Sequence, residues 1–160
     1  MPDAVGPAYP GVVQKTGVAA KKRAAALVGV VRERKATASR AFYEMGVALK
    51  ELHDRKLYGA LGYETFPAML RGEALVGKTF AFELIAVVLT FTLPEATRQG
   101  FQKSKALVRY ARATAAPDDP AALARSRVKV GGRARPTAEL SARAIERQAK
   151  VVRQSPWPLM

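Results

Sequence analysis

Four residues have the types and spacing of a phosphate-binding loop: Gly72, Gly77, Lys78 and Thr79. In nucleotide-binding proteins this loop follows a β-strand, and its glycine backbone cradles the phosphates. The residues before Gly72 instead have the periodicity of a helix. We therefore interpret the match as coincidental and place Lys78 and Thr79 in the first turn of a helix.

Other candidates for catalysis or metal binding are few. His53 is the only histidine, and the chain has no cysteine. It lies beside the apolar stripe of a helix, which favours a packed, locally hydrogen-bonded imidazole. The pair Asp118 and Asp119 lacks the further oxygen ligands that Mg²⁺ needs, and the serines have no evident base partner. We expect no enzyme activity, no metal site and no cofactor.

The charge indicates a polyanionic partner. Lys and Arg number 27 against 13 Asp and Glu, a formal net charge of +14. Such a balance suits nucleic acid, sometimes an anionic membrane surface, and otherwise a basic solvated surface. Residues 57–100 are close to neutral, so the flanking segments would contact phosphates. The residues expected to bind DNA are Lys78, Thr79, Lys103, Lys105, Arg109, Arg112, Lys21, Lys22 and Arg23.

The elements that position these residues are predicted to be helices. Ser39 can cap a helix that ends near Lys56. Thr65, with Pro67 in the first turn, starts a second helix. After a turn at Val76–Gly77, a third helix runs from Gly77 or Lys78 to about Phe91 and is apolar nearly all round, which is typical of a buried helix.

Two further helices follow. Thr92 and Glu95 have the spacing of a capping box, and Gly100 is a natural terminator. The next helix turns Leu107 and Tyr110 inward, with Lys103, Lys105, Arg109 and Arg112 outward.

The whole pattern predicts an all-α fold, a helix-turn-helix bundle with basic N- and C-terminal extensions. Residues 1–38 are expected to form a flexible, partly helical basic arm, and 39–114 the helix-turn-helix domain. Residues 115–136 are expected to be a linker, in which Arg127–Val130 is too short to predict a strand, and 137–160 a basic helix and tail. The tail around Trp157 is interpreted as a frayed end in preference to a docking peptide.

Residues 57–91, LYGALGYETFPAMLRGEALVGKTFAFELIAVVLTF, resemble bacterial helix-turn-helix DNA-binding proteins akin to the central domain of the ParB and KorB partition proteins. The resemblance covers roughly residues 43–112. It rests on Gly62, Tyr63, Phe66, Leu70, Leu75, Ala81, Leu84, Ile85 and Val87, with Thr65 in place of a serine. Most of these are packing positions, so the resemblance implies the fold more than the function.

The chain departs from that family on its reading helix. Phe80 stands where the relatives have a polar residue, and Glu83 and Ala86 replace basic residues. Only Lys78 and Thr79 are left to reach base edges from the helix start. Glu83 is expected to be a solvated charge or an intramolecular partner of a lysine.

Together these features predict a protein that binds duplex DNA mainly through the phosphate backbone, with limited sequence reading. It would be an accessory or regulatory protein of the nucleoid or plasmid type, cytoplasmic, without a signal peptide or membrane span. A homodimer fits this class. The alternatives are a protein-interaction module built on a degenerate helix-turn-helix, and RNA binding, which the charge equally permits but no RNA-binding motif supports.

Overall fold

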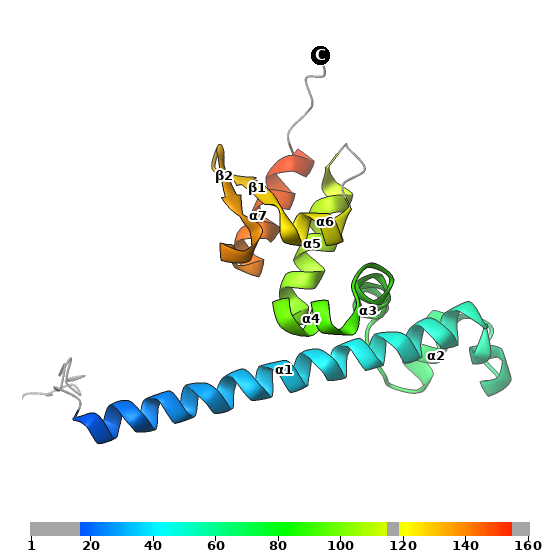
Figure 1. Cartoon of the computed structure of the whole chain (residues 1–160). Coiled ribbons are helices and arrows are strands. Elements are labelled where there is room, and N and C mark those ends of the chain that lie inside the picture. Colours follow the sequence, from blue (N-terminus) through cyan, green and yellow to red (C-terminus); the bar gives the residue numbers. More distant parts are fainter. Residues whose placement is uncertain (1–16, 115–118, 155–160) are drawn as a thin grey trace, which may run out of the picture. The chain divides into compact units, whose positions relative to one another are not determined.

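The structure, a computed structural model, describes residues 17–114 and 119–154 (Figure 1). Residues 1–16 of the expected arm, Asp118, and the tail 155–160 with Trp157 lie outside the described residues. The chain divides into two compact units, Met1–Arg34 and Lys35–Met160.

Helices account for 78% of the described residues. These residues form seven α-helices, two short 3-10 helices and one two-stranded hairpin. The elements are α1 (Val18–Asp54), η1 (Leu57–Leu61), α2 (Phe66–Gly72), α3 (Lys78–Thr90), α4 (Leu93–Gln99), α5 (Phe101–Ala113), α6 (Pro120–Arg125), β1 (Arg127–Val130), β2 (Arg133–Pro136), η2 (Thr137–Glu139) and α7 (Ala142–Gln154). The mostly helical fold is therefore confirmed, but the expectation of an all-α chain is wrong because of the hairpin.

The helix predicted to begin at Ser39 begins much earlier. α1 runs unbroken from Val18 to Asp54, because the segment before Ser39 is rich in Ala, Lys and Arg, which are strong helix formers, and contains no proline. Ser39 is buried, and its Oγ accepts a hydrogen bond of 3.3 Å from the backbone N–H of Phe101. The cap therefore serves the start of α5, a segment distant in the sequence.

Other local signals are confirmed. The Thr65 hydroxyl caps α2 by accepting from the N–H of Ala68 at 3.2 Å. Gly77 is the N-cap of α3, and Gly100 ends α4 with φ of 85°. The capping box of Thr92 and Glu95 is fully formed.

The expected linker 115–136 holds α6 and the hairpin. β1 and β2 are antiparallel, with Val130 opposite Arg133. Gly131 and Gly132, with φ of 58° and 79°, form the two-residue turn that a tight hairpin requires. Val128 is only 1% exposed, so β1 packs on the core. The sequence signal was the Gly-Gly pair after alternating valines, rather than the length of the strand.

The C-terminal helix, α7, also packs on the core. Ile145 of α7 is fully buried, and α7 has its most extensive packing against α5. The largest fully buried side chains come from α2, α3, α5, α7 and β1, and are Met69, Leu84, Leu107, Ile145, Val87 and Val128. The hydrophobic core thus includes residues beyond the predicted boundary at Thr114.

α3 lies mostly in this core, with five buried residues. Among the described residues, no single helix has the length and apolar composition to cross a membrane. Only α3 and α4 taken together reach that length and apolar composition, and these two helices are bent by 115° relative to each other.

α1 and α3 approach each other closely at Gly46. A Cβ atom at this buried position would lie 2.8 Å from the carbonyl oxygen of Leu84 and 2.7 Å from a methyl group of Val88. Because one of these atoms is backbone, α3 would have to shift. We expect Gly46→Ala to lower the free energy of unfolding by about 1–3 kcal/mol in urea denaturation.

Gly29, also in α1, is the matched control. A Cβ there meets nothing within 4 Å. Alanine is the better helix former, so Gly29→Ala should leave the stability unchanged or raise it by up to about 1 kcal/mol. Equal stability of the two variants would show that the helices do not approach this closely.

Candidate nucleic-acid interface

The start of α3, which we call the α3 tip, consists of Gly77, Lys78 and Thr79 and is exposed. Gly77 has an extended backbone and contributes no side-chain cap, so the first N–H groups of the helix have no side-chain partner from that residue. Beyond the tip, the residues Ala81, Leu84, Ile85, Ala86 and Val87 are buried. The accessible polar surface of α3 is therefore concentrated in its first turn.

Phe80 of α3 is a packing residue. Its ring lies edge-on to Phe42 at 5.9 Å and to Phe101 at 5.8 Å, and those two rings stack at 4.8 Å. This aromatic cluster joins α1, α3 and α5. Phe80 is thus unavailable to read bases.

A groove of about 530 Å³ lies beside the α3 tip. It is lined by residues of α3, α5 and α7, namely Thr79, Glu83, Arg109, Glu146, Ala149, Lys150 and Arg153. We call this the α3–α5–α7 groove. Basic side chains therefore adjoin the start of a helix, an arrangement that suits an anion.

A network of ion pairs crosses this groove. Glu83 pairs with Arg109 through one carboxylate oxygen, and its other oxygen lies 3.7 Å from Nζ of Lys105. Arg109 also contacts the carboxylate of Glu146 at 3.2 Å. Glu83 and Lys105 are each only 15% exposed, whereas Arg109 is 43% exposed. Of the two expectations for Glu83, a solvated charge or an intramolecular partner of a lysine, the structure shows the second, and Arg109 joins Lys105 as a partner.

The structure brings together only part of the predicted set. Thr79 and Arg109 line the groove, and Lys105 adjoins it through Glu83. Lys78 is exposed at the α3 tip and Arg112 on α5. The remaining predicted residues of this kind, Lys21, Lys22 and Arg23, are exposed in the first unit.

Lys103 lies elsewhere. Its ammonium group donates a 3.1 Å hydrogen bond to the carbonyl of Ala138, and burial lowers its pKa. It lines a second cavity, of about 210 Å³, with residues of α4 and α6. The structure therefore does not bring Lys103 into the α3–α5–α7 groove.

Lys150 and Arg153 are the basic groove residues that the sequence analysis missed. They follow Glu146 by four and seven residues, so the three share one side of α7. Ile145 and Ala149, both buried, lie on the neighbouring side of the helix, and Ala149 also lines the groove. This spacing is visible in the sequence. The proximity of these residues to α5 depends on how α7 packs in the tertiary structure.

His53 behaves as predicted. Its ring packs edge-on against Phe66 at 5.2 Å and Phe82 at 5.6 Å, and Nδ1 lies 3.0 Å from the carboxylate of Asp54.

A helix, α2, precedes the Gly72–Thr79 pattern, in place of the strand that a phosphate-binding loop follows. Within the ranges 17–114 and 119–154, no cluster of three or more His, Asp or Glu side chains could hold a metal ion.

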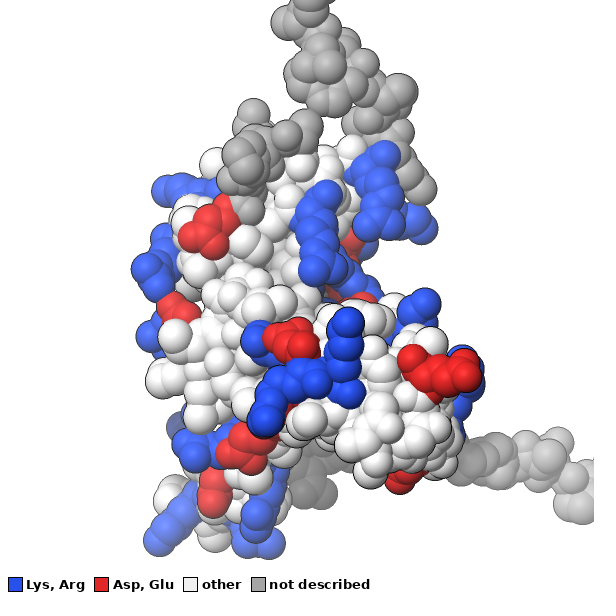
Figure 2. All heavy atoms as spheres, turned by 90° about the vertical axis from the view of Figure 1, so that its right-hand side faces the viewer, with Lys and Arg blue, Asp and Glu red and all other residues white. Residues whose placement is uncertain are grey.

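Acidic groups accompany the basic ones on the surface. On the face drawn in Figure 2, Lys and Arg side chains occur in several groups, with Asp and Glu side chains among them. The positive charge of this face is therefore interrupted by carboxylates.

No protein-family model, curated protein or solved structure matches this chain.

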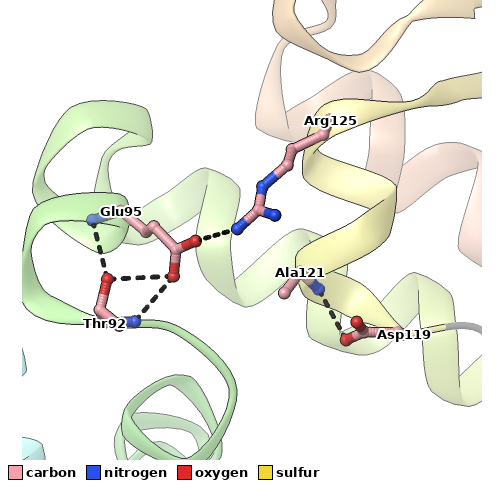
Figure 3. Close-up of polar contacts among 5 residues, drawn as sticks. All are labelled: Thr92, Glu95, Asp119, Ala121 and Arg125. Atoms are coloured by element: carbon pink, nitrogen blue, oxygen red, sulfur yellow. Dashed lines mark hydrogen bonds and ion pairs between the residues drawn. The ribbon is translucent and has the colours of Figure 1, made fainter.

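Beside the cavity that Lys103 lines, Glu95 joins α4 to α6 (Figure 3). One carboxylate oxygen accepts from the backbone N–H of Thr92 at 2.9 Å, and the other lies 2.5 Å from Arg125. Asp119 caps α6 by accepting from the N–H of Ala121 at 3.0 Å. The hydrogen bond from the Thr92 backbone, followed by the Arg125 contact, lowers the pKa of Glu95.

This lowered pKa predicts a pH dependence. A carboxylate whose pKa is lower in the folded state stabilises the fold above its ordinary pKa of about 4.3, and this contribution is lost as the pH falls through the lowered pKa. Glu95→Gln should therefore lower Tm at pH 7, and the difference from wild type should shrink toward pH 3. The exposed Glu64→Gln is the control. A Tm difference for Glu95→Gln that does not change with pH would contradict the prediction.

Proposed function

We propose that this protein binds duplex DNA, chiefly through the phosphate backbone, with α2, the segment Glu73–Gly77 and α3 as its helix-turn-helix. The observation that carries the proposal is the exposed α3 tip beside a groove that contains Arg109, Lys150 and Arg153. Helix starts and basic side chains are the groups that contact phosphates in DNA complexes. The net charge of +14 and the resemblance to the ParB and KorB central domain support the same proposal.

Sequence reading in this proposal is limited. The exposed residues of α3 are Lys78, Thr79, Phe82 and Leu89, of which only the first two are polar. Arg112 and the basic residues of the first unit would add phosphate contacts, which raise affinity without reading bases. Such binding suits an accessory or regulatory protein of the nucleoid or a plasmid in the cytoplasm, acting as a homodimer.

The test is a titration of duplex DNA at several salt concentrations. For about 6–8 phosphate contacts, the plot of log K against log[salt] should have a slope of about −5 to −7. A flat plot would contradict the proposal, and tighter binding of structured RNA would favour the RNA-binding alternative. Lys78→Ala with Thr79→Ala should reduce the preference among DNA sequences if the α3 tip reads bases.

A second candidate function is a protein-interaction module. An almost wholly apolar cavity of about 260 Å³ lies between α1 and the segment before α3. It is lined by Met45, Ala48, Leu49, Leu52, Leu75 and Val76, and Leu75 is 50% exposed. Absence of binding to both DNA and RNA would favour this candidate.

A further inference from the structure

The cations around the α3–α5–α7 groove fall into two classes. Lys105 and Arg109 contact Glu83, and Arg109 also contacts Glu146. Among the described residues, Lys150 and Arg153 form no ion pair. A phosphate that enters the groove therefore meets two available cations and two that already have a carboxylate.

Glu83 lies where it competes with a bound phosphate. It follows Thr79 by four residues, so both lie on the same side of α3, and both line the groove. Its two oxygens contact different cations, one on each of two successive turns of α5. Carboxylates and phosphates both bind arginine through paired N–H donors, so a phosphate at Arg109 must displace Glu83 or share its donors.

We propose that Glu83 is an internal competitor that limits polyanion binding by the groove, an inference that rests on the proposed DNA-binding function. While Glu83 is paired with Arg109 and Lys105, these two side chains neutralise few DNA phosphates. Few of the counterions condensed on the DNA are therefore released at these side chains. The protein then binds DNA more weakly, and with a shallower salt dependence, than its number of basic residues would give.

Glu83→Gln is the direct test, because glutamine keeps the shape and removes the charge. Binding of a duplex DNA should become about tenfold tighter or more near 0.1 M salt, and the slope of log K against log[salt] should become more negative by about 1–2. Glu64→Gln, at an exposed site, changes the net charge equally and should leave the slope unchanged.

A second pair of variants does not require the loss of Glu83, in case Glu83→Gln fails to fold. Lys105→Gln removes a cation that Glu83 already holds and should hardly change the salt slope. Lys150→Gln removes an available cation and should reduce the slope by about 1. Equal effects of the two would overturn the inference.

The outcomes separate the two proposals. If wild type binds DNA with the expected slope and Glu83→Gln is indistinguishable from it, the competitor role of Glu83 is rejected and the proposal of DNA binding stands. If only Glu83→Gln binds, the competitor is supported in its strongest form. If neither a folded wild type nor a folded Glu83→Gln variant binds duplex DNA, both proposals fail.

Discussion

Replacing Lys150 and Arg153 together by glutamine is expected to weaken duplex DNA binding by about a hundredfold at low salt and to reduce the salt slope by about 2. The reason is geometric. Both residues line the groove beside the α3 tip, and among the described residues neither is held by a carboxylate. They are thus the groove cations that most readily neutralise DNA phosphates and release the counterions condensed on the DNA.

The matched control is the pair Arg40→Gln and Arg98→Gln. These exposed residues lie on α1 and α4 and do not line the groove, yet their replacement removes the same charge. If net charge alone drives binding, both double variants lose affinity equally. If the groove is the interface, the variant that lacks Lys150 and Arg153 loses much more affinity than the control variant. Fluorescence anisotropy over a series of salt concentrations distinguishes the two results.

The second large effect is expected on stability. Ile145→Ala should lower the free energy of unfolding by about 2–5 kcal/mol in urea denaturation, because Ile145 is fully buried where α7 packs on α5. A similar truncation on the exposed side of this helix, Val151→Ala, should change the free energy of unfolding by no more than about 0.5 kcal/mol, since Val151 is 55% exposed.

This comparison decides whether α7 belongs to the folded unit. An extension that is helical but unpacked would tolerate both substitutions. A large loss for Ile145→Ala alone requires the α5–α7 contact. Because Lys150 and Arg153 depend on α7 for their position, the same result would support the geometry of the groove.

The local boundaries of several helices could be predicted from the sequence. Thr65, Thr92 and Gly100 act on backbone groups no more than four residues away, so their effect on the chain does not depend on distant partners. The same is true of Gly77 at the start of α3. The start of α3, where the tip of the candidate site lies, could therefore be predicted from these local signals.

Ser39 shows where local reasoning fails. A serine before an amphipathic stretch is a sound N-cap signal, but the preceding residues are helix formers, and α1 continues through it. Its hydroxyl caps α5 instead, 62 residues away. The choice between two partners for one hydroxyl was decided by packing.

The sequence by itself determined that the chain is mostly helical, where α2, α3 and α4 begin, and that its charge suits a polyanion. Only the tertiary structure decided that α7 and β1 complete the core, that Lys103 turns away to Ala138, and that Glu83 holds Arg109 and Lys105. Caps and periodicity act over one or two turns, whereas a groove forms from side chains that are distant in sequence and meet only when apolar faces are buried together.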